Sequence, residues 1–190
     1  MTTVEPIRDA KKIVAIKSIL KAGKYPRDYL LFALGINLAL RVSDLLALKV
    51  KDVLDRKGNI VESVHIREQK TNRQTKIMLN RTAKEALEFY FSKDGISNGE
   101  EFLFKSLRSN KALDRIRANT LINQWCKEVD LQGRFGTHTL RKTWGYRARK
   151  LGVSIELIQE KLGHRSPAVT RRYIGVTQDE VSNIEEKVCL

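Results

Sequence analysis

Residues 26–40 form an apolar stretch that constrains the architecture of this chain more than any other feature. The stretch is too long for an ordinary strand, and its apolar side chains would point in nearly every direction from a helix. A helix that is apolar all round must be buried by other elements. Pro26 suits its first turn, and a run of this length containing Asn37 is too short to span a bilayer. The sequence therefore predicts a domain built around one central buried helix.

Most of the remaining chain has apolar residues at helical spacing, and several predicted helices carry start signals. Pro6 suits a first helical turn, and Thr82 with Glu85 matches a capping box. Ser154 and Ser166 are favourable N-cap residues. We expect helices at residues 6–22, 26–40, 43–48, 82–91, 112–129, 137–150, 154–163, 166–175 and 177–188.

Three segments between the third and fourth predicted helices break this pattern, because β-branched residues become frequent there. Residues 60–67 alternate apolar and polar side chains, as a half-buried strand does. Residues 55–59 and 70–73 have the polar composition of hairpin turns. We therefore expect a mainly α-helical (α+β) fold with a small three-stranded antiparallel β-sheet. Its strands are predicted at residues 50–54, 60–67 and 75–79.

The chain is strongly basic: 36 Lys and Arg residues face 22 Asp and Glu residues, which gives a formal net charge of +14. A surplus of this size repels itself in a folded protein and favours an anionic partner. Nucleic acid, an anionic membrane and an acidic protein all meet that description. The basic residues are spread along the sequence, which favours a folded surface that contacts phosphates. A basic surface with no dedicated partner is the alternative.

The two cysteines, Cys126 and Cys189, lack the spacing of metal ligands or of a disulfide framework. We expect both to be free thiols in a reducing compartment. The start of the chain lacks the apolar core of a signal peptide. The sequence thus predicts a soluble, cytoplasmic protein that uses no metal or other cofactor and does not bind a membrane.

His138 and Arg141, three positions apart, are the first candidates for chemistry on a phosphate. On the helix predicted at residues 137–150 the two side chains share a face. The free N–H groups of its first turn favour an anion, and arginine can bind two phosphate oxygens at once. A histidine in a capping region beside a surface arginine would show the same pattern.

A second group of candidates lies near the end of the chain. His164 follows Gly163, where a predicted helix stops, and Tyr173 lies nine residues further on. Packing is the more common role of a tyrosine in such a place. The adjacent Arg171 and Arg172 could lower the pKa of Tyr173, contact a DNA backbone, or simply face solvent.

Arg41 ends the central apolar stretch, where a charged side chain needs a partner. That partner is either a bound phosphate or Asp44, which lies one helical turn further along the chain.

Taken in chain order, these residues resemble the tyrosine recombinase (integrase) family. That family has an arginine in a G-L-R-x-S-E-L-like box, a lysine in a β-hairpin, an H-x-x-R box, an L-G-H box, and a tyrosine about nine residues later. Lys70 lies in the predicted hairpin, although Lys76 is also nearby. The resemblance covers about residues 25–180. It assigns the family positions to Arg41, Lys70, His138, Arg141, His164 and Tyr173.

The resemblance implies DNA cleavage and rejoining without metal or ATP, since a covalent intermediate stores the energy of the broken bond. Tyr173 would attack the scissile phosphate, forming a 3′-phosphotyrosine and freeing a 5′-hydroxyl. His138 would act as the general base toward Tyr173 and as the acid on the return step. Lys70 would protonate the leaving 5′-oxygen.

The same resemblance assigns the residues around the phosphate. Arg41 and Arg141 would clamp its non-bridging oxygens, and His164 would donate a further hydrogen bond. Asp44 is a supporting residue that would hold Arg41 in place. Two departures from the family pattern are mild: Ala39 stands where glycine is usual, and Asp44 replaces the commoner glutamate.

Typical family members carry a helical domain before the catalytic domain, and nothing in this chain resembles it. We expect a single catalytic domain with a core at about residues 6–175 and a C-terminal helix at about residues 177–188, either excised or naturally short. Its DNA binding should be weaker and more sensitive to salt than that of a full clamp. The stripe formed by Val181, Ile184 and Val188 would pack on its own domain or on a neighbouring protomer.

The function that the resemblance implies is site-specific recombination, integrating or excising a mobile element of bacterial or phage origin. The partner would be double-stranded DNA, on which a homo-oligomer, expected to be a tetramer, assembles. One alternative is a type IB topoisomerase-like or resolvase activity with the same phosphotyrosine chemistry. Others are a DNA-binding module without cleavage, against which the complete set of six residues argues, and a basic RNA-binding protein, for which no aromatic-rich motif is present.

Overall fold

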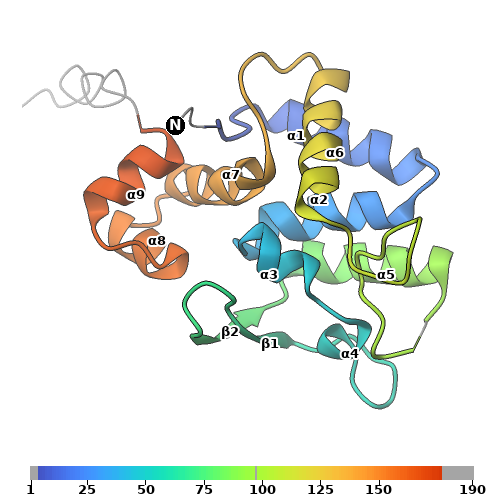
Figure 1. The fold of residues 1–190 in the computed structure, drawn as a ribbon. Coiled ribbons are helices and arrows are strands. Elements are labelled where there is room, and N and C mark those ends of the chain that lie inside the picture. The colour runs from blue at the N-terminus through green and yellow to red at the C-terminus, as the bar shows by residue number, and fades with distance from the viewer. Residues whose placement is uncertain (1–3, 97, 177–190) are drawn as a thin grey trace, which may run out of the picture.

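The computed structural model describes residues 4–96 and 98–176, so the predicted C-terminal helix and Cys189 lie outside the described residues. The described chain is mainly helical, with one hairpin (Figure 1). Its elements are α1 (Ala10–Ala22), α2 (Pro26–Leu38), α3 (Val42–Leu46), α4 (Val50–Val53), β1 (Ser63–Arg67), β2 (Gln74–Met78), α5 (Arg81–Asp94), α6 (Arg115–Glu128), α7 (Thr137–Lys150), α8 (Ile155–Leu162) and α9 (Pro167–Ile174).

The apolar stretch forms the central helix, as predicted. α2 contacts α1, α5 and α7, and its side chains from Leu30 to Leu34 are fully buried. Gly35 lets α7 approach closely, because a methyl group added there would lie 2.4 Å from Leu140 Cδ1. α2 stops before Ala39, whose φ of 56° lies in the left-handed region that favours glycine. Arg41 lies two residues after this turn, at the N-cap of α3.

The sheet has two strands in the described residues, so the prediction of three strands is wrong. The segment predicted as the first strand is α4, in which Val50 and Val53 are buried three positions apart, on one helical face. The Asp52 carboxylate stabilises its start by accepting a hydrogen bond from the Lys49 amide at 2.8 Å. The β-branched residues of this segment therefore reflect its burial and do not indicate a strand.

The hairpin itself is confirmed. β1 pairs with β2 in antiparallel register, with Val64 opposite Ile77, and both of these side chains are buried. The β1–β2 loop contains Lys70 (Figure 1), and Glu68 at the start of this loop lines one small pocket together with Lys161 of α8. The polar turn and the alternating apolar and polar residues before it thus predicted correctly that this lysine lies in the loop of a short hairpin.

Two of the four helix starts predicted from capping signals are correct. Ser154 and Ser166 cap α8 and α9 through their side chains, as expected. The other two starts differ: Asp9, after Pro6, caps α1, and Asn80 caps α5 in place of the expected Thr82. In each case a side-chain oxygen that reaches a free helix amide decides where the helix begins. Within residues 4–96 and 98–176, no helix has the length and apolar character needed to cross a membrane.

Candidate active site

A small apolar cluster, separate from the main core, holds α8 and α9 against α7. It contains Ala39, Ala148, Ile158, Leu162 and Ile174, with Tyr173 packed at its edge. Gly145 of α7 is necessary for this packing, because a methyl group there would lie 2.6 Å from Ile174 Cγ2. The cluster therefore fixes α9, which bears Tyr173, relative to α7, which bears His138 and Arg141.

The predicted nucleophile, Tyr173 of α9, contacts the predicted base, His138 of α7. His138, in the first turn of α7, places its Nδ1 atom 3.2 Å from the Tyr173 hydroxyl oxygen. Burial lowers the pKa of His138, and the positive charges of Arg115, Arg141 and Lys142 lower it further. The imidazole is therefore neutral at neutral pH and can accept the phenolic proton.

His164 lies against the other side of the same tyrosine. Its ring centroid is 4.7 Å from that of Tyr173, in an edge-to-face arrangement. The Nδ1 atom of His164 lies 3.1 Å from the Thr170 hydroxyl oxygen, which orients the ring. Burial lowers the pKa of His164 to about 4, with further contributions from Arg141 and Arg41.

The phenol of Tyr173 is stabilised in its protonated form. Burial raises its pKa above the usual value, although Arg141 and Arg41 act in the opposite direction. These two arginines, and not the exposed Arg171 and Arg172 considered from the sequence, are the cations that favour the phenolate. A half-buried phenol with a raised pKa needs a base before it can attack.

Arg141 is a buried cation held by the end of α8. Its side chain lies one turn after His138, the residue is 5% exposed, and its Nη2 atom donates to the Leu162 carbonyl oxygen at 2.6 Å. Arg141 Nε and Asp44 Oδ2 are buried, and neither has a hydrogen-bond partner among the described residues. Such groups are costly to a fold, so their presence favours a functional site over a packing arrangement.

Arg41 precedes α3 and pairs with a residue that sequence reasoning missed. Its Nη1 atom donates to Glu68 Oε2 at 2.5 Å, whereas the expected protein partner was Asp44. Asp44 instead accepts a hydrogen bond from the Gln69 amide at 2.9 Å through Oδ1. The expectation that Asp44 holds Arg41 is therefore wrong in its contact: Asp44 holds the hairpin loop next to Glu68.

Lys70 lies on that loop with an exposed side chain, two residues after Glu68. The alternative, Lys76, lies within β2 opposite His65. The structure thus brings Arg41 and four of the other predicted residues into one cluster, with Lys70 on the adjoining loop. Those four are His138, Arg141, His164 and Tyr173.

A second residue missed from the sequence is Lys142, which is 3% exposed and places Nζ 5.0 Å from the centre of the Tyr173 ring. Its position four residues after His138 on a predicted helix could have indicated that it shares the face of that histidine. Glu68 had a weaker signal, since its contact with Arg41 spans 27 positions.

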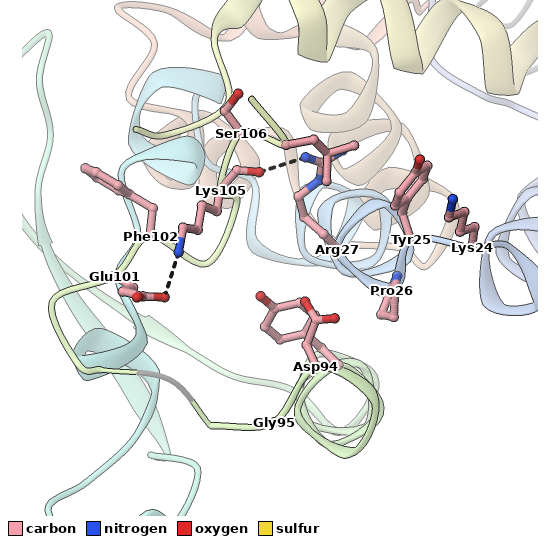
Figure 2. Close-up of a pocket in the computed structure, with 12 residues that line it drawn as sticks. Lys24, Tyr25, Pro26, Arg27, Asp94, Gly95, Glu101, Phe102, Lys105 and Ser106 are labelled. Atoms are coloured by element: carbon pink, nitrogen blue, oxygen red, sulfur yellow. Dashed lines mark hydrogen bonds and ion pairs between the residues drawn. The ribbon is translucent and has the colours of Figure 1, made fainter. Parts of the chain in front are cut away.

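A different cavity lies at the far end of α2 (Figure 2). It has a volume of about 300 Å³ between the start of α2 and the end of α5. Three of its charged groups have protein partners: Arg27 Nη1 donates to the Lys105 carbonyl oxygen at 2.7 Å, and Lys105 pairs with Glu101 at 3.2 Å. None of the cluster residues lines it. Among the described residues, no group of three or more His, Cys, Asp or Glu side chains could hold a metal ion.

In this helical domain a tyrosine, two histidines and two arginines share one basic site. This set of side chains is typical of proteins that transfer phosphoryl groups through a tyrosine. The profile of the phage integrase family matches residues 9–180. This chain belongs to that family, the tyrosine recombinases.

Individual relatives agree with this assignment. The chain is 40% identical over 179 residues to the probable integrase/recombinase YoeC of Bacillus subtilis, covering 94% of this chain and 93% of YoeC. It is 29% identical over 178 residues to the tyrosine recombinase XerA of Pyrococcus horikoshii, covering 92% of this chain but only 59% of XerA. The Tn1549 transposon integrase, solved in complex with a circular intermediate DNA, has the same fold. Its TM-score is 0.68 at 20% identity, over 99% of this chain and 67% of that structure.

Proposed function

We propose that this chain is the strand-cleaving and strand-joining domain of a site-specific DNA recombinase, with Tyr173 as the nucleophile. The observation that carries the proposal is the 3.2 Å contact between His138 Nδ1 and the Tyr173 hydroxyl. A tyrosine in contact with a neutral histidine, within a cluster of buried cations, has the components of an activated oxygen nucleophile. Family membership supports the same chemistry.

Cleavage begins with the loss of the phenolic proton. Because burial raises the pKa of Tyr173 and lowers that of His138, the ground state is a phenol beside a neutral imidazole. The Tyr173 oxygen attacks phosphorus as its proton passes to His138 Nδ1. A Tyr173–phosphorus bond forms while the bond from phosphorus to the 5′-oxygen breaks, and Lys70 donates a proton to that oxygen.

The transition state concentrates negative charge on the non-bridging phosphate oxygens. Arg41, Arg141 and His164 surround the place where that charge develops, and preorganised donors of this kind stabilise it without reorganising. The 3′-phosphotyrosine conserves the energy of the broken bond, so attack by another 5′-hydroxyl rejoins the strands without ATP. In this second step Lys70 accepts the proton of the attacking 5′-hydroxyl, and His138 returns its proton to Tyr173.

Double-stranded DNA is the proposed partner. The formal net charge of +14 favours a phosphate-rich ligand, and the Tn1549 integrase was solved with DNA. Strand exchange requires two duplexes to be cut together, so we propose that a homo-tetramer assembles on the DNA. The chain spans only 59% of XerA, and it is the catalytic part of the reaction that we assign to it.

A trapping experiment on DNA of randomised sequence tests the proposal. The protein is incubated with nicked duplexes from this pool, in EDTA and without ATP. Cleavage near the nick releases a short fragment, so the covalent complex cannot religate. We expect a denaturant-resistant protein–DNA adduct whose DNA converges on one sequence when amplified and reselected. Cleavage without an adduct, or no cleavage by protein that binds the DNA, would contradict the proposal.

A further inference from the structure

Glu68 connects the Arg41 side chain to the hairpin loop that bears Lys70. It follows the last residue of β1 and accepts hydrogen bonds on Oε2 from Arg41 Nη1 at 2.5 Å and from Thr71 Oγ1 at 2.6 Å. Its backbone closes the loop: the Glu68 amide donates to the Arg73 carbonyl at 2.9 Å, and the Asn72 amide donates to the Glu68 carbonyl at 2.8 Å. One carboxylate thus contacts both the arginine and the loop.

A second contact ties the same loop to the same corner of the fold. The Gln69 amide donates to Asp44 Oδ1 at 2.9 Å, and Asp44 lies in α3, which begins directly after Arg41. Glu68 and Gln69 are therefore both anchored to the segment that presents Arg41. Lys70 is the next residue, so its backbone position depends on these two anchors.

The charge on Glu68 suits this role. Burial favours its protonated form, but hydrogen bonds from Thr71 and Arg41, together with the charges of Arg41 and Arg141, hold its pKa below the usual value. Glu68 is therefore an anion at neutral pH, with only 17% of its side chain exposed. A charge-assisted hydrogen bond of this kind is stronger than a neutral one and fixes its partners more firmly.

The contact also leaves Arg41 able to bind a phosphate. Glu68 engages Nη1, whereas Nη2 faces the end of α8, where a methyl group added to Gly163 would lie 3.9 Å from it. His164 is the next residue along the chain and packs on Tyr173. One edge of the Arg41 guanidinium is thus directed toward the hairpin, and the other toward the tyrosine site.

We infer that Glu68 is a positioning residue that couples the Lys70 loop to Arg41, so that the proton donor is aligned when the arginine holds the scissile phosphate. The inference rests on the proposed function and adds a residue to it. A carboxylate that merely occupied the phosphate position would compete with DNA, and its removal would accelerate cleavage. Removing a positioning carboxylate would instead slow cleavage, and it would slow the step in which Lys70 donates its proton.

A change of leaving group isolates that step. Two duplexes of the sequence selected by trapping are compared: one has the natural 5′-oxygen at the scissile bond, and the other has sulfur in its place. A thiolate leaves without a proton, so only the oxygen substrate needs Lys70. The rate of adduct formation is measured for the wild type, Glu68→Gln, Lys70→Ala and Glu62→Gln. Glu62 is the matched control, because it pairs with Lys84 beside the same hairpin, away from Arg41.

General acid catalysis increases a reaction rate by about 10²- to 10⁴-fold, and a misaligned Lys70 would lose part of this increase. We expect Glu68→Gln to slow cleavage of the oxygen substrate by about 10- to 100-fold and that of the sulfur substrate by less than about threefold. Lys70→Ala should show the same selective defect, and Glu62→Gln should match the wild type on both substrates.

The other outcomes overturn the inference. Equal slowing of Glu68→Gln on both substrates would mean that Glu68 supports the phosphate clamp or the fold, not the Lys70 loop. Unchanged or faster cleavage of the oxygen substrate would mean that it positions nothing. If Lys70→Ala is slow on both substrates, Lys70 is not the proton donor that Glu68 could align. A wild type that forms no adduct with either duplex contradicts the proposed function itself, which distinguishes the two failures.

Discussion

The Nδ1 atom of His138 lies 3.2 Å from the phenolic oxygen of Tyr173, although the two residues are 35 positions apart in the chain. The contact joins the first turn of α7 to α9, and it exists because Gly145 allows those helices to pack closely. The proposed base and the proposed nucleophile therefore belong to one subunit in this structure. Cleavage should depend on that contact and on the cations around it.

The pH dependence of cleavage should report His138. The imidazole acts as a base only when it is neutral, and burial together with Arg115 and Arg141 lowers its pKa in the free protein. The second-order rate constant for adduct formation, which reports the free protein, should be at its plateau at neutral pH and fall as the pH drops through the lowered pKa of His138. His138→Gln should remove this acid limb and reduce the plateau by about 100-fold.

Arg115→Ala provides the control for that assignment. Removing one cation that disfavours the imidazolium should move the acid limb to higher pH without removing it. An acid limb that keeps its position in the His138→Gln variant belongs to another group and would contradict the role of His138.

Arg141→Ala should affect both chemistry and stability. We expect cleavage to slow by about 10²- to 10³-fold, the cost of removing one preorganised donor to a developing oxyanion. Loss of its hydrogen bond to the Leu162 carbonyl should lower the free energy of unfolding by about 1–3 kcal/mol. Single-turnover kinetics and denaturant unfolding measure the two effects. Arg117→Ala, which removes an exposed arginine from α6, should leave both unchanged; equal loss in both variants would mean that only net charge matters.

Gly145→Ala tests the packing that positions the nucleophile. The added methyl group would meet Ile174 Cγ2 at 2.6 Å, on a β-branched side chain with little freedom to move. We expect an overpacking cost of about 1–3 kcal/mol and a decrease in cleavage rate as α9 shifts. Gly152→Ala is the comparison, since nothing lies within 4 Å of a methyl group there although its φ of +83° adds strain. If Gly145→Ala cleaves at the wild-type rate, the α7–α9 contact does not set the position of Tyr173.

DNA binding should weaken steeply with salt. The formal net charge of +14 favours a complex stabilised by phosphate contacts, each of which releases a counterion. For about six such contacts the affinity should fall about 10³-fold between 50 and 200 mM salt. Fluorescence anisotropy with a labelled duplex measures this slope, and binding that is insensitive to salt would contradict a phosphate-based interface.

Much of the fold could be predicted because local signals and burial agreed. The apolar stretch became α2, and side-chain caps at Ser154 and Ser166 began α8 and α9. The segment of α4 was predicted as a strand because Val50 and Val53 are β-branched. A short helix can also accommodate such residues when both side chains are buried. Burial is decided by the tertiary fold, and a short segment does not reveal it.

The candidate site shows a similar division. Motif spacing indicated six candidate residues for chemistry on a phosphate, and the structure brings five of them together while leaving Lys70 on an exposed loop. The residues that support them were not predictable. Glu68 meets Arg41 only because the hairpin folds back on the corner before α3, and local sequence pointed to Asp44, three positions away. Partners contributed by distant segments depend on topology, which spacing does not encode.

Identifying the residue joined to DNA tests whether Tyr173 is the nucleophile. Trapped adduct is digested with trypsin and nuclease and analysed by mass spectrometry. Cleavage after Arg172 and Lys187 gives a peptide, residues 173–187, in which Tyr173 is the only tyrosine. We predict a nucleotide attached through a 3′-phosphate to Tyr173, and no adduct from Tyr173→Phe protein that still binds the duplex. Attachment to any other residue, or an adduct formed by Tyr173→Phe, would contradict the assignment of Tyr173 as the nucleophile.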